Sequence, residues 1–279
     1  MPFRSHRPVP PLQNFIENFW LYDGYSSAYM RERIFPTGAF EFVFNLRDDE
    51  LRIYDSKPPL CSRYSGALVS GPYDGFFLTD RAEKASTMGV HFRPGGAFPF
   101  LGISAYVLAN THIDLVTIWS RPVEKIREQL ALARSPEHRF QLLENALLTR
   151  LRRSLEHHPA VSLALHVLHS GNSRVLVRKL VREAGVSDRR FVDVVRAEVG
   201  LNPKLFHRVQ RFSYSAASLS FFFTRTTVTF ENPSSNVGGR SFPAIRRITS
   251  SSTIRCRRRL RSRHTSRGTS KNNACTSYP

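Results

Sequence analysis

The most informative stretch of the sequence is residues 173–212, SRVLVRKLVREAGVSDRRFVDVVRAEVGLNPKLFHRVQRF. Apolar residues recur at i, i+4 and i+8 in its first part, at Leu176, Leu180 and Ala184. This spacing is typical of one face of an α-helix, and Ser173 is suited to cap its N-terminus. The first part therefore predicts a short amphipathic helix.

Gly185 separates this helix from a second one. Glycine accepts the positive φ that commonly ends a helix, and Gly200 can end the second helix in the same way. Ser187 is the candidate N-cap, and the Asp188 carboxylate favours the positive end of the helix dipole. The predicted core face consists of Phe191, Val194, Val195 and Val199. The opposite face carries Arg189, Val192, Asp193 and Arg196.

A third helix is expected to begin directly after the second. Asn202 is its candidate cap, and Pro203 suits the first helical position, where no backbone N–H is needed. Phe206, Val209 and Phe212 fall on one side of this helix.

A short helix, a glycine turn and a helix displaying arginines together suit the major groove of DNA. Residues 174–211 carry ten lysines or arginines against four acids, a density that can attract phosphates. Two other interpretations stay open: the helices only pack against another element, or the charges form a solvated face.

The run from Val175 to Phe212 resembles the first helix-turn-helix unit and the start of the linker helix in AraC/XylS-type transcription regulators. Three N-terminal motifs resemble the first domain of one subset of that family: Pro36 to Glu41, Gly71–Pro72, and Phe92 to Gly95. The resemblance covers residues 8–212. It implies that the chain binds double-stranded DNA and regulates transcription in the cytoplasm, with a small-molecule effector and a homodimer as further partners.

The resemblance places the candidate DNA contacts on the second and third helices. The candidate base contacts are Arg189, Val192 and Asp193. The candidate phosphate contacts are Arg190, Arg196, Lys204 and Arg208, and Ser187 and Asn202 act as helix caps. Asp193 has a second interpretation, because it can pair with Arg189 at i, i+4.

The remaining patterns predict an α+β chain with four parts. Residues 1–117 contain alternating segments such as RIFPTGAFEFVFNL, expected of a β-barrel or sandwich that acts as a sensor. Residues 118–158 predict connecting helices, one capped by Ser120, that either dimerise or pack on their own β domain. Residues 159–212 are the DNA reader that the resemblance implies, and the second unit that the family has does not follow them. Residues 213–279 show no sustained helical period.

The tail 213–279 holds 23 serines or threonines and a net charge of +11, out of +19 for the whole chain. It is either a basic arm that follows phosphates or the product of a reading frame displaced near codon 212. The change of character inside a helix that the family needs favours the displaced frame.

Several other kinds of site find little support. The three cysteines show no metal spacing, and the usual catalytic motifs are missing, so neither an enzyme nor a cofactor is expected. His166 with His169, or His91 with Glu41 in a cupin-like barrel, would hold a metal only with further ligands. No stretch is apolar enough to span a membrane.

Two features of the β-rich part leave alternatives open. Arg93 before two glycines suits either an anion or a structural turn. Candidate aromatic residues for an effector pocket, each of which suits the core equally well, are Trp20, Tyr22, Phe42, Phe44, Phe77 and Phe92. The alternative to a DNA-binding regulator is thus a small-molecule-binding β-barrel protein with a helical remnant that no longer reads DNA.

Overall fold

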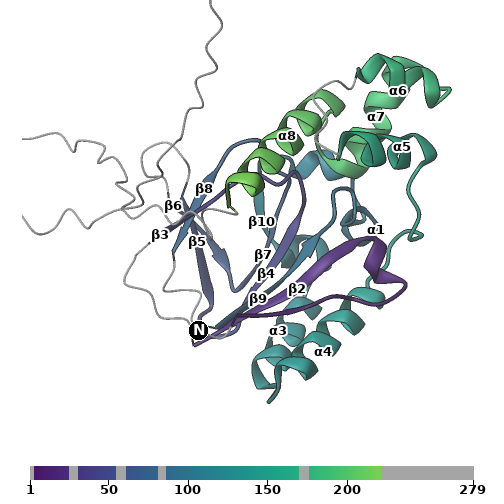
Figure 1. Cartoon of the computed structure of the whole chain (residues 1–279). Helices are drawn as coiled ribbons and strands as arrows, with labels where there is room; N and C mark the ends of the chain where they lie inside the picture. Colours follow the sequence, from purple (N-terminus) through teal and green to yellow (C-terminus); the bar gives the residue numbers. More distant parts are fainter. Residues whose placement is uncertain (1–2, 25–30, 55–60, 81–85, 170–175, 221–279) are drawn as a thin grey trace, which may run out of the picture. The chain divides into compact units, whose positions relative to one another are not determined.

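The computed structural model describes residues 3–24, 31–54, 61–80, 86–169 and 176–220, with side chains as far as residue 216. Its strands are β1 (Phe3–His6), β2 (Ile16–Asp23), β3 (Arg31–Ile34), β4 (Glu41–Asn45), β5 (Glu50–Tyr54), β6 (Cys61–Ser65), β7 (Ala67–Ser70), β8 (Phe77–Asp80), β9 (Ser86–Phe92) and β10 (His112–Asp114). Its helices are η1 (Leu12–Asn14), α1 (Phe98–Leu101), η3 (Ala105–Leu108), α2 (Leu115–Trp119), α3 (Pro122–Leu132), α4 (Pro136–Leu148), α5 (Pro159–Leu168), α6 (Val177–Glu183), α7 (Asp188–Val199) and α8 (Pro203–Ser220). The order confirms an α+β chain in which helices follow a β-rich N-terminal region (Figure 1).

The strands form two sheets. The larger sheet has the order β1-β2-β9-β4-β7-β10, and the smaller one the order β3-β8-β5-β6. All their strand pairs are antiparallel. In Figure 1 the smaller sheet lies on the left, and helices α3 and α4 lie beyond the other face of the larger sheet.

The strand β4 shows how the larger sheet uses its two faces. Phe42 and Phe44 are fully buried, whereas Glu41 and Val43 on the alternate positions are partly exposed. The phenylalanines belong to a core shared with helices α1 to α4, as Phe42 packs edge-on against Trp119 at 5.3 Å between ring centroids. The predicted alternation therefore separates a helix-covered face from a face that looks toward the smaller sheet.

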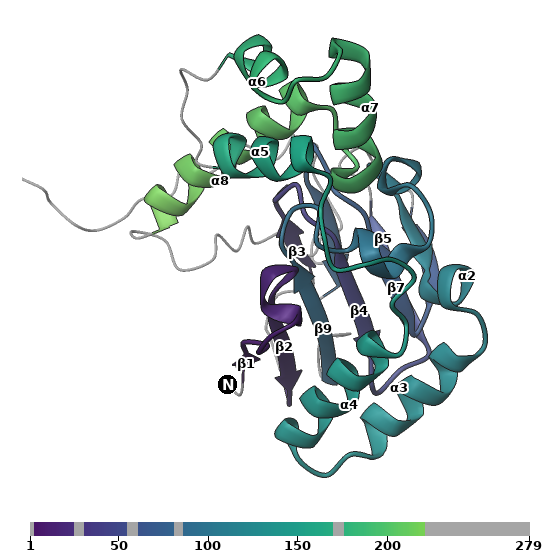
Figure 2. The same ribbon diagram turned by 90° about the vertical axis from the view of Figure 1, so that its right-hand side faces the viewer.

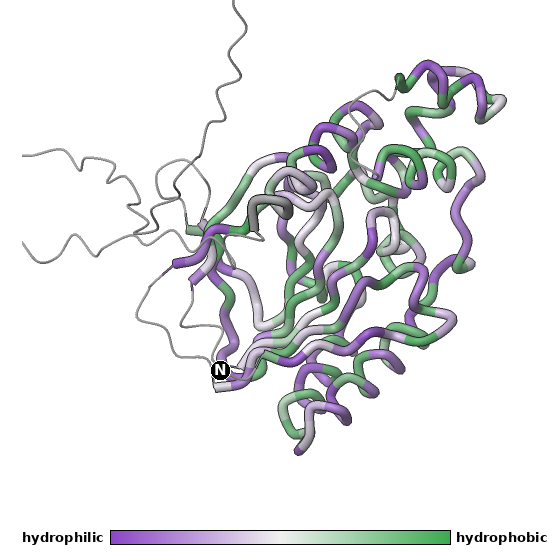
Figure 3. The backbone as a smooth tube through the Cα atoms, in the orientation of Figure 1, coloured by the Kyte–Doolittle hydropathy of each residue, from purple (hydrophilic) through white to green (hydrophobic). Residues whose placement is uncertain are grey.

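Helices α3 and α4 pack on their own sheet, which is the second of the two roles considered for residues 118–158. Their buried residues Leu130, Phe140 and Leu143 belong to the same core as the strands. Hydrophilic and hydrophobic residues alternate along both helices (Figure 3), as expected for helices with one covered face.

One detail of this region corrects the sequence prediction. Ser120 does not cap α3: it follows α2 with a φ of 61°, and the N-cap position of α3 is Arg121, without a side-chain cap. The tight turn between α2 and α3 directs the Ser120 backbone away from a capping conformation. The helix α3 ends at Leu132, which is 81% exposed.

Helices α5 to α8 have a hydrophobic core of their own. It includes Leu180 from α6, Phe191 and Val195 from α7, and Phe206 and Val209 from α8. In Figure 2 these four helices lie together at the top of the view. The expected first residue of the apolar stripe, Leu176, precedes α6 and is 71% exposed. The proposed cap Ser173 lies outside the described residues.

The helix α8 corrects the expectation that helical structure stops near residue 212. It continues to Ser220, and the Ser213 Oγ donates to the carbonyl of Pro36 at 3.0 Å. Ser215 donates to the carbonyl of Arg211, one turn earlier in the helix. These bonds satisfy two serine hydroxyls that composition alone assigns to a tail. Residues 221–279 lie outside the described part.

Candidate functional site

Helix α7 begins and ends as its sequence predicts. Ser187 Oγ accepts a hydrogen bond from the backbone N–H of Arg190 at 3.2 Å, and Gly200 follows the helix with a φ of 90°. Asn202 likewise accepts from the backbone N–H of Leu205 at the start of α8. Gly185 between α6 and α7 has a φ of 64°. Side-chain caps and positive-φ glycines thus fix where each helix starts and stops.

The N-terminal half of α7 is open to solvent. The side chain of Arg189 is 94% exposed and that of Asp193 is 56% exposed, and the two form an i, i+4 ion pair at 3.9 Å. Arg190 is also exposed, whereas Val192 is half-buried. The three candidate base contacts therefore all lie in the solvent-accessible N-terminal half of α7.

The C-terminal half of α7 faces the N-terminal region. The guanidinium of Arg196 lies over the Tyr106 ring at 3.5 Å from its centroid. On α8, Arg208 approaches the Asp74 carboxylate at 3.8 Å, while Lys204 is exposed. Two of the four candidate phosphate contacts, Arg196 and Arg208, therefore have intramolecular partners in this structure.

A buried carboxylate ties α7 to the segment before α5. Glu198 is 6% exposed and its Oε2 lies 2.7 Å from His157 Nδ1. Its Oε1 accepts from the backbone N–H of His158 at 3.1 Å. The sequence pattern did not single out Glu198, because its partners His157 and His158 lie about 40 residues earlier in the chain.

Helix α8 also contacts the segment between β3 and β4. Gln210 Nε2 donates to the carbonyl of Thr37 at 2.7 Å, and the rings of Phe212 and Phe35 lie 5.8 Å apart. With the Ser213 bond to Pro36, these contacts hold the helix against residues 35–38.

A cavity of about 700 Å³ lies between the two sheets. Of the six aromatic residues proposed from the sequence, Trp20, Tyr22 and Phe77 line it. The other three, Phe42, Phe44 and Phe92, belong to the core under the helices. Phe212, Ser213 and Ala216 of α8 complete the lining, so an occupant of the cavity would touch the helix that follows α7. This volume is within the range of small-molecule sites.

Five polar residues form a row across the cavity face of the larger sheet. Register pairs Asn18 with His91, His91 with Glu41, Glu41 with Ser70, and Ser70 with His112. All five line the cavity. Directly opposite residues on neighbouring strands point to the same face. We call this set the polar row.

Trp20 and Gly89 shape the middle of the polar row. The Trp20 indole Nε1 donates to Glu41 Oε1 at 2.8 Å. A Cβ atom at Gly89 would lie 2.4 Å from the Trp20 ring, so the missing side chain gives the indole its space. His91 Nδ1 lies 3.9 Å from the same carboxylate oxygen.

His112 ends the polar row inside an aromatic box. Its ring stacks on Tyr73 at 4.7 Å and meets Phe77 edge-on at 4.5 Å. It is 8% exposed, and neither ring nitrogen has a hydrogen-bond partner among the described residues. Burial lowers the pKa of His112 to about 4, because the charged ring would lose its hydration. At neutral pH the ring therefore offers one donor and one acceptor.

This burial predicts an acid-sensitive fold. Below pH 6.5 the unfolded chain binds a proton at His112 that the folded chain does not, so acidification favours unfolding. We expect a loss of about 2 kcal/mol between pH 6.5 and pH 5 from this residue. Urea titrations at both pH values measure it. His112→Phe should remove this part of the pH dependence, whereas His138→Gln on the exposed start of α4 should not. The same loss of unfolding free energy between pH 6.5 and pH 5 in the unchanged protein and in both variants would contradict the prediction.

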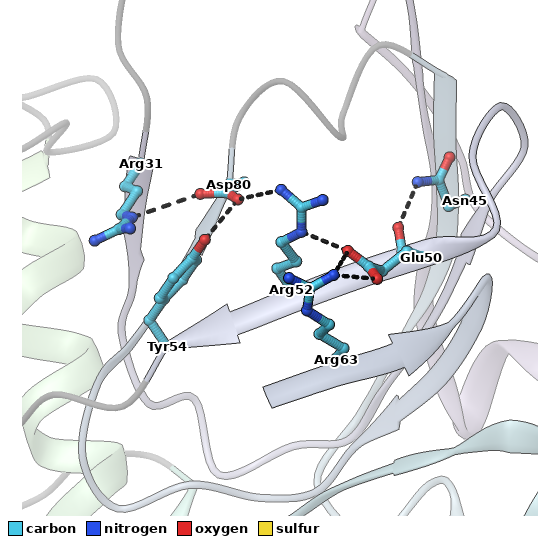
Figure 4. A network of polar contacts seen from close by, with 7 residues as sticks. All are labelled: Arg31, Asn45, Glu50, Arg52, Tyr54, Arg63 and Asp80. Carbon is cyan, nitrogen blue, oxygen red and sulfur yellow. Dashed lines mark hydrogen bonds and ion pairs between the residues drawn. The ribbon is translucent and has the colours of Figure 1, made fainter. Parts of the chain in front are cut away.

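The smaller sheet carries a polar network on strands β3, β5, β6 and β8 (Figure 4). Asp80 accepts from the Tyr54 hydroxyl at 2.8 Å and pairs with Arg31. Burial, followed by the hydrogen bond to Asp80, raises the pKa of Tyr54 to about 12. Hydrogen bonds from Arg52 and then from Arg63 lower the pKa of Glu50. The two carboxylates of this network, Asp80 and Glu50, are thus paired with arginines from neighbouring positions of the smaller sheet, which favours a structural role for them.

The other candidate ligands have structural surroundings. Arg93 pairs with Glu17 and donates to the carbonyl of Gln13, which favours the structural interpretation of the Phe92 to Gly95 motif. His169 Nδ1 lies 2.9 Å from the Gln210 side-chain oxygen. Within the described residues, no three histidine, cysteine or acidic side chains are grouped to hold a metal, and no helix is long and apolar enough to cross a membrane.

A family model described as a domain of unknown function (DUF6597) matches residues 4–114. An apo ToxT variant from Vibrio cholerae strain SCE256 is similar to 77% of this chain and 89% of its own, with 8% identity and a TM-score of 0.39. ToxT from Vibrio cholerae O395 is similar over 78% and 83%, with 11% identity and a TM-score of 0.35. No curated protein matches the chain. The family match thus covers the β-rich region, including all of the polar row.

Proposed function

We propose that this chain is a sequence-specific DNA-binding regulator of transcription of AraC type, with residues 159–212 as its reader. The observation that carries the proposal is the division of α7. Its rear face, with Phe191 and Val195, is buried, while Arg189 at its N-terminal end is 94% exposed. In helix-turn-helix proteins the N-terminal residues of the second helix meet the base edges.

The spacing of α6, Gly185 and α7 supports the same proposal. Ser187 fixes the start of α7, so the exposed arginines occupy defined positions. Arg189 can donate two hydrogen bonds to guanine, and Arg190 and Lys204 remain exposed for phosphates. Arg189 and Asp193 lie one turn apart on the open side of the helix, 3.9 Å from each other.

The reader in this proposal is half of the family's usual module. A single unit addresses one segment of major groove, so specific binding should be weak and strongly dependent on salt. The proposal gives the chain no catalytic role and expects it in the cytoplasm. A homodimer through α3 and α4 is less favoured, since their buried residues already pack on the larger sheet.

The base-contact assignment predicts the effect of Arg189→Ala. We expect this change to weaken binding to a specific site by about 1–3 kcal/mol, because a bidentate contact to one base is lost. Fluorescence anisotropy with the upstream region of its own gene, and with random duplex as comparison, measures it. Arg134→Ala, an exposed arginine between α3 and α4, is the matched control. An equal loss on both DNAs would show that Arg189 contacts only phosphates.

The cavity supports a second candidate, a small-molecule-binding β-barrel protein whose helices do not read DNA. Its volume of about 700 Å³ suits a small organic ligand whether or not DNA is bound. Electrophoretic mobility on the upstream region distinguishes the two. A specific shift at low salt favours the regulator, and equal affinity for every sequence favours the alternative.

A further inference from the structure

The polar row gives the cavity a recognition surface of definite chemistry. Its five side chains lie on five adjacent strands, which extends the row across about 19 Å at the usual strand spacing. Within this row His112 is more than nine-tenths buried, lines the cavity and lacks a hydrogen-bond partner among the described residues. A buried polar group without a partner is costly unless a ligand or water satisfies it.

The charge of this wall selects between ligands. Glu41 stands in the centre of the row, where it accepts from Trp20 and lies near His91. The cavity lining contributed by the larger sheet contains no lysine or arginine in the described residues. The arginine of the lining, Arg33, belongs to the smaller sheet; its guanidinium stacks on Phe76 at 4.2 Å, and its buried Nε has no hydrogen-bond partner among the described residues. A carboxylate placed at the row would therefore meet Glu41 without a compensating cation on the same sheet.

The cavity also has an apolar part. Leu51, Ile53 and Phe77 of the smaller sheet form a hydrophobic cluster with Leu68 of the larger sheet, and Ile34 and Val43 pack against it. All six residues line the cavity, and the smaller sheet adds Glu32, Arg33, Thr79 and Asp80 to the lining. An apolar cluster beside a row of hydrogen-bonding groups is an arrangement that orients an amphipathic molecule.

We infer that the cavity binds a small organic molecule with an aromatic or branched apolar body and a neutral or cationic, hydrogen-bond-donating head, and that the polar row holds this head. The inference rests on the proposed function, in which this molecule is the effector. The carboxylate of Glu41 accepts from the head, Ser70 and His112 complete its hydrogen bonds, and the apolar body lies against the smaller sheet.

Three probes that differ only in their heads test the inference: 3-phenylpropylamine, 3-phenylpropan-1-ol and 3-phenylpropanoate. Binding to the full chain is measured by calorimetry. Because the chain also contains Trp119, quenching of tryptophan fluorescence that a Trp20→Phe variant loses serves as the check on location. We expect the amine to bind at least about tenfold more tightly than the carboxylate, with the alcohol between them, because a charge-assisted bond to Glu41 favours the amine.

Two variants connect this preference to the polar row. Glu41→Gln keeps an oxygen that can accept from Trp20 but removes the charge. It should lower the affinity for the amine about tenfold and the affinity for the alcohol less than about threefold. Ser70→Ala, a second and milder change, should weaken both. Glu137→Gln on the exposed side of α4 is the matched control and should change neither.

Three results would overturn the inference: tighter binding of the carboxylate than of the amine, an unchanged amine affinity in a folded Glu41→Gln protein, or no binding of any probe at 5 mM, roughly the weakest affinity worth considering. The ligand titrations are carried out without DNA. A negative result in them would leave the DNA-binding proposal intact, and a negative result in the DNA-binding experiment would leave the inferred ligand class intact.

Discussion

Replacing Glu198 with alanine is expected to lower the free energy of unfolding by about 3 kcal/mol. Glu198 is 6% exposed and accepts hydrogen bonds from the His157 ring at 2.7 Å and from the His158 backbone N–H at 3.1 Å. Alanine would leave both donors in a buried site without an acceptor. The same change would loosen α7 from the segment that leads into α5. Urea denaturation followed by circular dichroism measures the loss.

A matched glutamate on the neighbouring helix controls for loss of charge. Glu183→Ala removes an exposed i, i+4 pair with Lys179 and should cost no more than about 0.5 kcal/mol. Glu198→Gln keeps one acceptor, so its loss of unfolding free energy should lie between those of the two alanine variants. If both alanine variants lose the same stability, the bonds to His157 and His158 contribute nothing and this part of the interface is not formed in solution.

The helical part of the candidate site was predictable because its signals are local. A serine before an aspartate, or an asparagine before a proline, acts within one turn of its own position, and Ser187 and Asn202 accept the expected backbone bonds. The period of Phe191, Val194 and Val195 is also local, and these side chains are buried. Leu176 fails for a related reason: it continues the period, but the helix begins after it.

The polar row was not predictable in the same way. Alternation along β4 places Glu41 on one face, yet its neighbours in space come from four other strands. Asn18, Ser70 and His112 carry no motif, and only the strand order and register bring them together. In the sequence, His91 with Glu41 found little support as a metal pair, because no further ligand is placed. The structure places the two side by side with a tryptophan N–H on the carboxylate instead of further ligands.

The docking of α7 and α8 on the N-terminal region was also beyond reach of a local pattern. Arg196 and Arg208 look free in the sequence because charged residues on helices usually face solvent. Their partners Tyr106 and Asp74 are far away in the chain. If Arg196 and Arg208 contact phosphates, they do so beside Tyr106 and Asp74, so the docking of the two helices limits how these two side chains are oriented toward DNA.

Replacing Gly200 with alanine is expected to cost about 3–4 kcal/mol, because two penalties act at one position. Its φ of 90° disfavours any residue with a Cβ atom. The added Cβ would also lie 2.6 Å from Pro72 Cγ and 3.1 Å from the carbonyl oxygen of Ala105. Gly185 has a φ of 64°, and a Cβ there would meet nothing within 4 Å. Gly185→Ala should therefore show the conformational penalty alone, about 1 kcal/mol.

The difference between the two glycine variants measures how closely the end of α7 approaches the Gly71–Pro72 turn. Pro72→Ala removes the ring atom that the new Cβ would meet, so we expect it to restore part of the stability that Gly200→Ala loses, by about 1–2 kcal/mol in a double-mutant cycle. The same substitution should restore nothing in the Gly185→Ala protein. If the cycle shows no coupling between positions 72 and 200, α7 is not held against this turn in solution.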